Sequence, residues 1–192
     1  MKLLVDRLSS TPTRFRFEAD SGWWAAHMRR EAGLPQELPE AFVFELSAHL
    51  MGEDLYLEGA ASGALELECS RCLARYRHGL REPFRLVLEP AGARVPADPE
   101  GALALARDGL CLGSEFEAGW YRGSEVHLGP FFLEVIALVL PVKPLCREDC
   151  PGLCPRCGAD LSQGPCGCGD ARPDSPFAAL APLRAVLRGG KS

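Results

Sequence analysis

Cysteine is concentrated in two parts of this 192-residue chain, at spacings typical of metal ligands. One group is the pair Cys69 and Cys72, and the other places six cysteines between residues 146 and 168, namely Cys146, Cys150, Cys154, Cys157, Cys166 and Cys168. Thiolates from two tight turns can converge on one zinc ion about 2.3 Å away, whereas disulfides across such short loops are rare in a reducing compartment. The sequence therefore predicts structural zinc, with one or two ions per chain.

The clearest ligand set lies between residues 154 and 168. In Cys154-Pro155-Arg156-Cys157-Gly158, glycine after the second cysteine lets the backbone turn so that both sulfur atoms face one ion. Cys166 and Cys168 can supply the other two thiolates. We call the set Cys154, Cys157, Cys166 and Cys168 the local site.

A second set is inferred from the cysteines that remain. Cys69 and Cys72 form a lone two-cysteine turn, and Cys146 and Cys150 have no other partners, so these four would complete a second site and leave only Cys111 free. We call this set the bridging site, because it would connect the chain near residue 70 to the chain near residue 148. Closed four-thiolate sites lack an open coordination position, so both would be structural rather than catalytic.

Other arrangements of the cysteines remain open at this stage. Members of the two groups could share one ion, or the thiols could carry no metal. The spacing of Cys150, Cys154 and Cys157 also occurs around iron-sulfur clusters of radical enzymes, but those belong to barrels that need more chain than is available here. A thioredoxin-like role for Cys69 and Cys72 would require a βαβ unit, which the preceding sequence does not predict.

Alternation of apolar and polar residues predicts strands before the first cysteine pair and directly after it. They are expected at residues 13–19, 41–49, 55–58, 64–68 and 76–89, with 59–63 as a separation and one or two further strands between 116 and 126. Closely spaced strands of this kind favour an antiparallel sheet or a partial barrel. Residues 91–108 show no clear period and are interpreted as a loop.

Two helices are expected. The apolar stretch 131–140 ends at Pro141 and Pro144, which remove backbone donors, and a short helix is expected to begin near Ser175. The fold class is therefore α+β, with a mainly antiparallel sheet or partial barrel and a central helix. The expected domains are a β-rich domain at 1–145, a cysteine-rich zinc-binding segment at 146–170, and a C-terminal helix and tail at 171–192.

Charge is unevenly distributed along the chain. Residues 69–88 carry five arginines against one glutamate, whereas seven carboxylates and no Lys or Arg lie between Glu31 and Glu58. The molecule is therefore expected to be electrically two-faced. The five arginines are Arg71, Arg75, Arg77, Arg81 and Arg85. They could bind RNA phosphates, with Tyr76 and Phe84 stacking on bases. Alternatively, they could form an ordinary solvated face.

Composition indicates an ordered protein of the cytoplasm. The chain is 47% hydrophobic and 24% charged, and its first residues do not resemble a signal peptide. The apolar run 131–142 is too short to span a membrane.

The four histidines are scattered, and neither a phosphate-binding loop nor a nucleophile elbow is present, so an enzyme is not expected. Cys111 is expected to be buried.

Several motifs together resemble a known family. They are Leu67-Glu68-Cys69-Ser70-Arg71-Cys72-Leu73, then His127-Leu128-Gly129-Pro130, then Cys150-Pro151-Gly152-Leu153-Cys154-Pro155-Arg156-Cys157-Gly158, and finally Ser175-Pro176-Phe177. Their order and spacing are similar to those of the YceD-like large ribosomal RNA subunit accumulation proteins. The chain departs from the family pattern at His127, at Ser162 and in an Ala-rich insertion before Asp108.

The resemblance implies a small bacterial cytoplasmic protein that supports synthesis, processing or accumulation of large-subunit ribosomal RNA, without enzymatic activity. Its partner would be ribosomal RNA, a pre-ribosomal particle or a ribosomal protein, and no membrane. The alternative is a scaffold or regulator that binds only protein, through the acidic segment 31–58. A third possibility, an RNA-processing enzyme, lacks candidate catalytic groups. The sequence gives no indication of oligomeric state.

Overall fold

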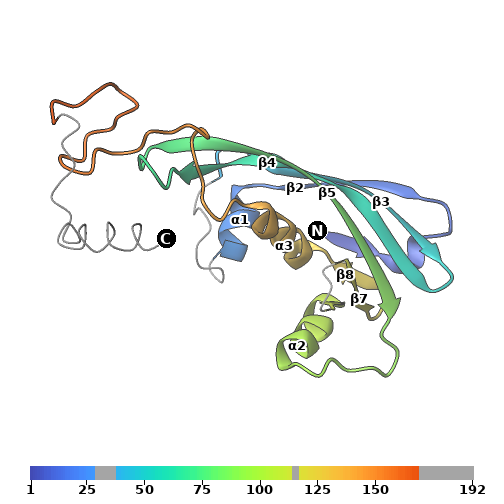
Figure 1. Ribbon diagram of the computed structural model, residues 1–192. Helices are drawn as coiled ribbons and strands as arrows, with labels where there is room; N and C mark the ends of the chain where they lie inside the picture. The colour runs from blue at the N-terminus through green and yellow to red at the C-terminus, as the bar shows by residue number, and fades with distance from the viewer. Residues whose placement is uncertain (29–37, 114–116, 169–192) are drawn as a thin grey trace, which may run out of the picture.

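The computed structural model describes residues 1–28, 38–113 and 117–168 (Figure 1). Its elements follow one another as β1 (Lys2–Leu4), the 3₁₀ turn η1 (Val5–Arg7), β2 (Thr13–Ala19), α1 (Ser21–Met28), β3 (Phe42–Met51), β4 (Asp54–Glu68), β5 (Arg75–Pro90), α2 (Pro99–Asp108), β6 (Leu110–Leu112), β7 (Ala118–Tyr121), β8 (Glu125–His127) and α3 (Gly129–Val139).

The central element is an open six-stranded sheet in the order β2-β3-β4-β5-β7-β6. All neighbouring strands are antiparallel except β5 and β7. A separate two-stranded sheet joins β1 to β8. The predicted α+β class with a mainly antiparallel sheet is therefore confirmed, and the sheet does not close into a barrel.

Strands β2 and β3 form where alternation predicted them, but β1 was not expected and β4 is longer than expected. It runs without a break through residues 59–63, which the sequence pattern had indicated as a separation. The glycines have a packing reason instead: a Cβ on Gly59 would lie 2.2 Å from the carbonyl oxygen of Glu45, and one on Gly63 would lie 2.5 Å from the Phe42 ring. Close approach of β3 therefore requires glycine inside β4.

One face of the sheet is covered by helices α1 and α3 (Figure 1). The Phe132 ring of α3 stacks on Phe44 of β3 with centroids 4.0 Å apart, and Phe131 meets Phe84 of β5 edge to face at 5.4 Å. Trp24 of α1 stacks on Phe42 at 6.1 Å. These aromatic side chains are buried and form the middle of the hydrophobic core. The helix predicted at 131–140 is confirmed by α3.

Beyond the core, β4 and β5 continue together as a two-stranded arm. Pairing of β3 with β4 ends at Val43 and Ser62, so residues 63–68 pair only with 75–80 of β5. We call these two segments the β4–β5 arm. In Figure 1 the arm runs from the sheet toward the orange segment that follows α3. The first cysteine pair lies in the loop at its tip.

The stretch 91–108 differs from its interpretation as a loop. Residues 99–108 form α2, whose N-terminus is capped by the Asp98 carboxylate accepting from the backbone N–H of Gly101, and which ends at Gly109 with φ of 65°. The strands expected between 116 and 126 are confirmed by β7 and β8. The helix expected near Ser175 lies outside the described residues. None of the helices in the described ranges is long and apolar enough to cross a membrane.

Candidate metal centres

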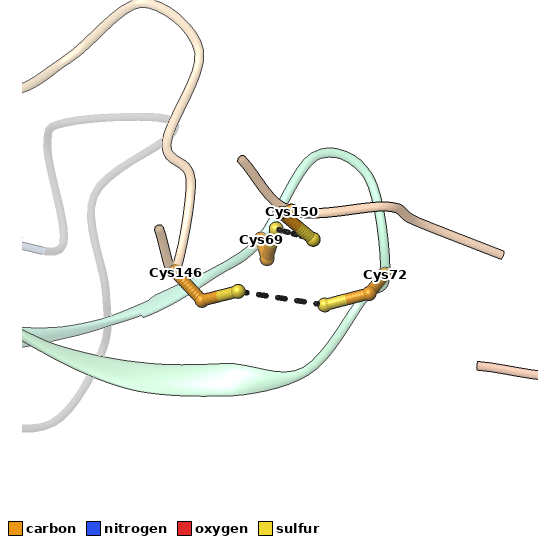
Figure 2. Close-up of side chains that lie close together, drawn as sticks. All are labelled: Cys69, Cys72, Cys146 and Cys150. Carbon is orange, nitrogen blue, oxygen red and sulfur yellow. Dashed lines mark hydrogen bonds between the residues drawn. The ribbon is translucent and has the colours of Figure 1, made fainter. Parts of the chain in front are cut away.

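The bridging site begins in the loop at the tip of the β4–β5 arm. The backbone N–H of Leu73 donates to the carbonyl of Cys69 at 2.9 Å, and the N–H of Cys69 donates to the carbonyl of Ala74 at 2.9 Å. These bonds close a tight turn between the two strands. Cys69 and Cys72 therefore present their sulfur atoms on the same side of the loop, as Figure 2 shows.

The other two thiols of the bridging site come from the segment that leaves α3. Pro144 fixes this segment on the loop, because its carbonyl accepts from the N–H of Ser70 at 2.8 Å. The sulfur atoms of Cys69 and Cys150 are 3.8 Å apart, and those of Cys72 and Cys146 are also 3.8 Å apart (Figure 2). All four sulfur atoms lie within 4.8 Å of one another.

These distances suit a metal ion better than a disulfide. Four sulfur atoms at about 2.3 Å from a tetrahedral zinc ion are about 3.8 Å apart, whereas a disulfide requires about 2.05 Å. Cys69, Cys72 and Cys150 are buried and Cys146 is partly buried, so water has little access to the four sulfur atoms. The bridging site could therefore hold a metal ion in a closed, four-thiolate environment.

The local site contains a turn with the same hydrogen bonds as the turn of Cys69 and Cys72. This second turn lies in the segment after Cys150. The N–H of Gly158 donates to the carbonyl of Cys154 at 2.9 Å, and the N–H of Cys154 donates to the carbonyl of Ala159 at 2.8 Å. The sulfur atoms of its four cysteines also lie within 4.8 Å of one another. This site is more open than the bridging site, since Cys157 is exposed and Cys166 and Cys168 are only partly buried.

Hydrogen bonding lowers the pKa of the first cysteine of each set. Backbone N–H groups, that of Cys146 first, lower the pKa of Cys69 to about 6. The N–H groups of Cys157 and Arg156 lower the pKa of Cys154 to about 6. Burial raises the pKa of Cys146 to about 12, and the thiol of Cys157 is the main cause that raises the pKa of Cys168 to about 12. The lowered pKa favours the thiolate form of Cys69 and Cys154, whereas Cys146 and Cys168 would need a nearby cation to ionise.

The short segment Pro151-Gly152-Leu153, to which the sequence analysis gave no structural role, connects the two sites. The N–H of Leu153 donates to the carbonyl of Arg71 at 3.2 Å, and Leu153 forms an isolated β-bridge with Asp160. Gly152 has φ of 77°, and a Cβ there would lie 3.0 Å from the Arg71 carbonyl. In the sequence, the Pro151-Gly152 pair is typical of a tight turn and could have indicated this connection.

The five candidate arginines divide into two groups. Arg71 lies in the loop, and its guanidinium donates to the carbonyls of Cys150 at 2.9 Å and Glu148 at 3.2 Å. The others are exposed on the face of β5 that points away from the helices, namely Arg75, Arg77, Arg81 and Arg85. Tyr76 and Phe84 belong to the opposite face, and Phe84 is buried against α3, so it cannot stack on RNA. The arginines and the two aromatic side chains lie on opposite faces because successive side chains of a strand point to opposite sides of the sheet.

Carboxylates lie among these arginines. Strand β4 places Glu68 opposite Arg75, Glu66 opposite Arg77 and Glu58 opposite Arg85, whereas Arg81 faces Ser62. Arg77 also forms an ion pair with Glu40 at 2.5 Å. Pairing of β4 with β5 therefore brings opposite charges from separate stretches of sequence onto one face, so the expected separation of charge does not hold on this face.

Comparison with known proteins identifies the family of this chain. The family model described as "Large ribosomal RNA subunit accumulation protein YceD" matches residues 57–184, which is more than half of the chain. The matched region contains the β4–β5 arm, α3 and all eight cysteines of the two sites. The chain therefore belongs to the YceD family of large ribosomal RNA subunit accumulation proteins.

Individual relatives are more distant. An uncharacterized protein of Mycobacterium tuberculosis is 29% identical over 121 residues, which cover 63% of this chain and 52% of that protein. The "Large ribosomal RNA subunit accumulation protein YCED homolog 1, chloroplastic" of Arabidopsis thaliana is 23% identical over 153 residues, covering 70% of this chain and 46% of that protein. The chain spans about half the length of the curated relatives it matches. No solved structure matches it.

Proposed function

We propose that each site binds one structural zinc ion. The observation that carries this proposal is the 3.8 Å separation of the paired sulfur atoms in the bridging site, which is the edge of a zinc–thiolate tetrahedron. With four thiolates on each ion no position is left for water, so the metal stabilises the fold and performs no hydrolysis. Residues 1–145 would then form the β-rich domain and residues 146–170 a zinc-binding segment bound to the tip of the arm, followed by the tail at 171–192.

The protein acts, in this proposal, as a noncatalytic cytoplasmic factor in assembly of the large ribosomal subunit. Support comes from membership of the family and from the name of the Arabidopsis relative. Because the bridging site connects the arm to the segment after α3, loss of its metal would release this segment from the arm. The function would then depend on Cys69 and Cys72 through their effect on the fold.

This dependence can be tested in cells. In a bacterial strain that lacks its own copy of the gene, the wild-type protein should restore the ratio of large-subunit to small-subunit ribosomal RNA. The double variant Cys69→Ser/Cys72→Ser should fail to do so, while Cys111→Ser, a change to a buried cysteine outside both sites, should restore the ratio. Full restoration by the double variant would contradict the proposal that the bridging site supports the function.

Direct contact with ribosomal RNA is best tested at Arg81. Among the exposed arginines of β5 it is the one that faces a serine rather than a glutamate, and it forms no ion pair within the described residues. Arg81→Glu should weaken RNA binding and flatten its dependence on salt in a filter-binding series, because a phosphate contact is lost. Arg7→Glu, the same charge change at an exposed position of η1, is the control. Equal affinities for the two variants would exclude RNA binding by this face.

The mixed charge of the same face favours a second candidate function. Alternating arginine and glutamate across β4 and β5 is less suited to a polyanion than to a protein surface with complementary charges. In this alternative the chain is a protein-only scaffold that binds a basic partner, with exposed carboxylates of the acidic segment such as Glu53 and Glu58 contributing. Crosslinking in cells distinguishes the two: attached ribosomal RNA supports the first function, and attached protein alone supports the second.

A further inference from the structure

The two turns that carry the first cysteine pairs have the same sequence pattern and geometry. Residues 69–74 and residues 154–159 both read Cys-x-Arg-Cys-x-Ala. In each turn the fifth residue donates its N–H to the carbonyl of the first, and the first donates to the carbonyl of the sixth, at 2.8 to 2.9 Å. The fifth residue has positive φ in both, 60° at Leu73 and 72° at Gly158. The chain therefore contains one metal-binding turn twice.

The arginine at the third position has the same contact in both turns. The Nη1 atom of Arg71 donates to the carbonyl oxygen of Cys150 at 2.9 Å, and Nη1 of Arg156 donates to the carbonyl oxygen of Cys168 at 3.2 Å. Cys150 and Cys168 are the last cysteines of the bridging and the local site, respectively. In each site, then, the arginine of the first cysteine pair holds the backbone of the second pair.

We propose that Arg71 and Arg156 are equivalent positioning residues that hold the second cysteine pair of each site on the first, and thereby set how firmly each site retains its metal. The proposal rests on the metal binding in the proposed function. A divalent ion bound by four thiolates leaves a net charge of about −2, so a guanidinium beside the site is favourable electrostatically as well as through its hydrogen bond. Metal can leave only when one cysteine pair moves away, and the arginine opposes this movement.

The two arginines differ in the length of sequence that separates each one from the carbonyl it contacts. Arg71 contacts two carbonyls, those of Glu148 and Cys150, across more than seventy residues of sequence. Arg156 contacts one carbonyl only twelve residues away, in a segment whose ends already lie close together. Loss of Arg71 should therefore weaken the bridging site more than loss of Arg156 weakens the local site, because the longer loop gains more freedom when it is released.

The experiment uses the full chain loaded with zinc and follows transfer of the metal to a coloured chelator in excess. To observe one site at a time, Arg71→Gln is placed in a Cys154→Ser/Cys157→Ser chain, and Arg156→Gln in a Cys69→Ser/Cys72→Ser chain. Each glutamine variant should release its remaining ion about 10- to 100-fold faster than its parent. Arg75→Gln, at the first residue of β5 directly after the turn and without an ion pair in the described chain, should leave the rate unchanged.

A second measurement separates positioning from general destabilisation, and can still be made if a serine variant fails to fold. In the chain with all its cysteines, cobalt replaces zinc, and its visible absorption reports the geometry of the thiolate sites. Arg71→Gln should alter the bands of one cobalt ion and leave the unfolding midpoint of the metal-free protein unchanged. Equal release rates for the glutamine variants and their parents, or altered bands for both cobalt ions in the Arg71→Gln chain, would overturn the proposal. A wild-type chain that binds no metal would instead overturn the proposed zinc sites themselves.

Discussion

Leu73 occupies the position in the bridging-site turn that Gly158 occupies in the local-site turn, and both have left-handed backbone, with φ of 60° and 72°. A leucine in this conformation is strained by about 1–2 kcal/mol, because its Cβ crowds the following carbonyl. Leu73 is also 56% exposed, so packing offsets little of this cost. Leucine at this point is a local disadvantage for the fold.

Leu73→Gly should therefore stabilise the zinc-loaded protein. The strain that is relieved exceeds the backbone entropy that a glycine loses on folding, which leaves a gain of about 0.5–1 kcal/mol in the free energy of unfolding. Leu73→Ala keeps the Cβ and is the control that should show no such gain. Urea denaturation measures both variants, and a lower midpoint for Leu73→Gly than for Leu73→Ala would refute the argument.

The stack of Phe132 on Phe44 should be a major contribution to stability. Phe132→Ala leaves a cavity between α3 and the sheet, and we expect it to lower the free energy of unfolding by about 3–5 kcal/mol. Leu138→Ala, on the same helix but 59% exposed, should change it by less than about 0.5 kcal/mol. Denaturant titration of the two variants tests this, and equal losses would mean that α3 does not pack as described.

The two glycines of the β4–β5 arm should respond differently to alanine. Gly63→Ala would place a Cβ 2.5 Å from the Phe42 ring, so we expect a loss of about 1–3 kcal/mol through displacement of β3. A Cβ on Gly79 would meet no atom within 4 Å, so Gly79→Ala should be neutral or slightly stabilising. Thermal unfolding of both variants gives the comparison, and the reverse order would contradict the close approach of Phe42 to β4.

The small sheet of β1 and β8 contains a carboxylate that should titrate at unusually low pH. A hydrogen bond from Lys2 is the main cause that lowers the pKa of Glu125 below 4.5, and His127 adds to the effect. A lowered pKa in the folded state means that the stabilising contribution is present above pH 4.5 and is lost as the pH falls through the folded value. Lys2→Met should raise the pKa of Glu125, as measured by NMR titration; no change would exclude the contact.

Sequence reasoning succeeded where the cause of a structure lies in neighbouring residues. The alternation of residues 13–19 fixes β2, and the spacing of Cys154 and Cys157 gives a turn that directs both sulfur atoms to one side. The partners of Cys69 and Cys72 could be inferred only by counting the cysteines left over, since no residue near position 70 indicates that residues 146–150 lie beside it. The structure brings these four sulfur atoms together, and zinc binding by them stays a prediction.

The predictions that were wrong depended on residues far away in the sequence or on capping residues that were not considered. Gly59 and Gly63 resemble loop residues until Phe42 and Glu45 are seen beside them. Helix α2 was missed because its alanines and glycine show no clear period, although Asp98 and Gly109 mark its two ends. The mixed charge on the outer face of β4 and β5 was not expected, because charge runs along a chain do not show which charges strand pairing brings opposite one another.

The central claim is that eight cysteines bind two metal ions in two separate sites, and native mass spectrometry of the freshly purified chain tests it most directly. The wild type should carry two zinc ions, and Cys69→Ser/Cys72→Ser and Cys154→Ser/Cys157→Ser should each carry one. A wild-type chain with no zinc, or with a single ion that is lost in both double variants, would contradict two separate four-cysteine sites.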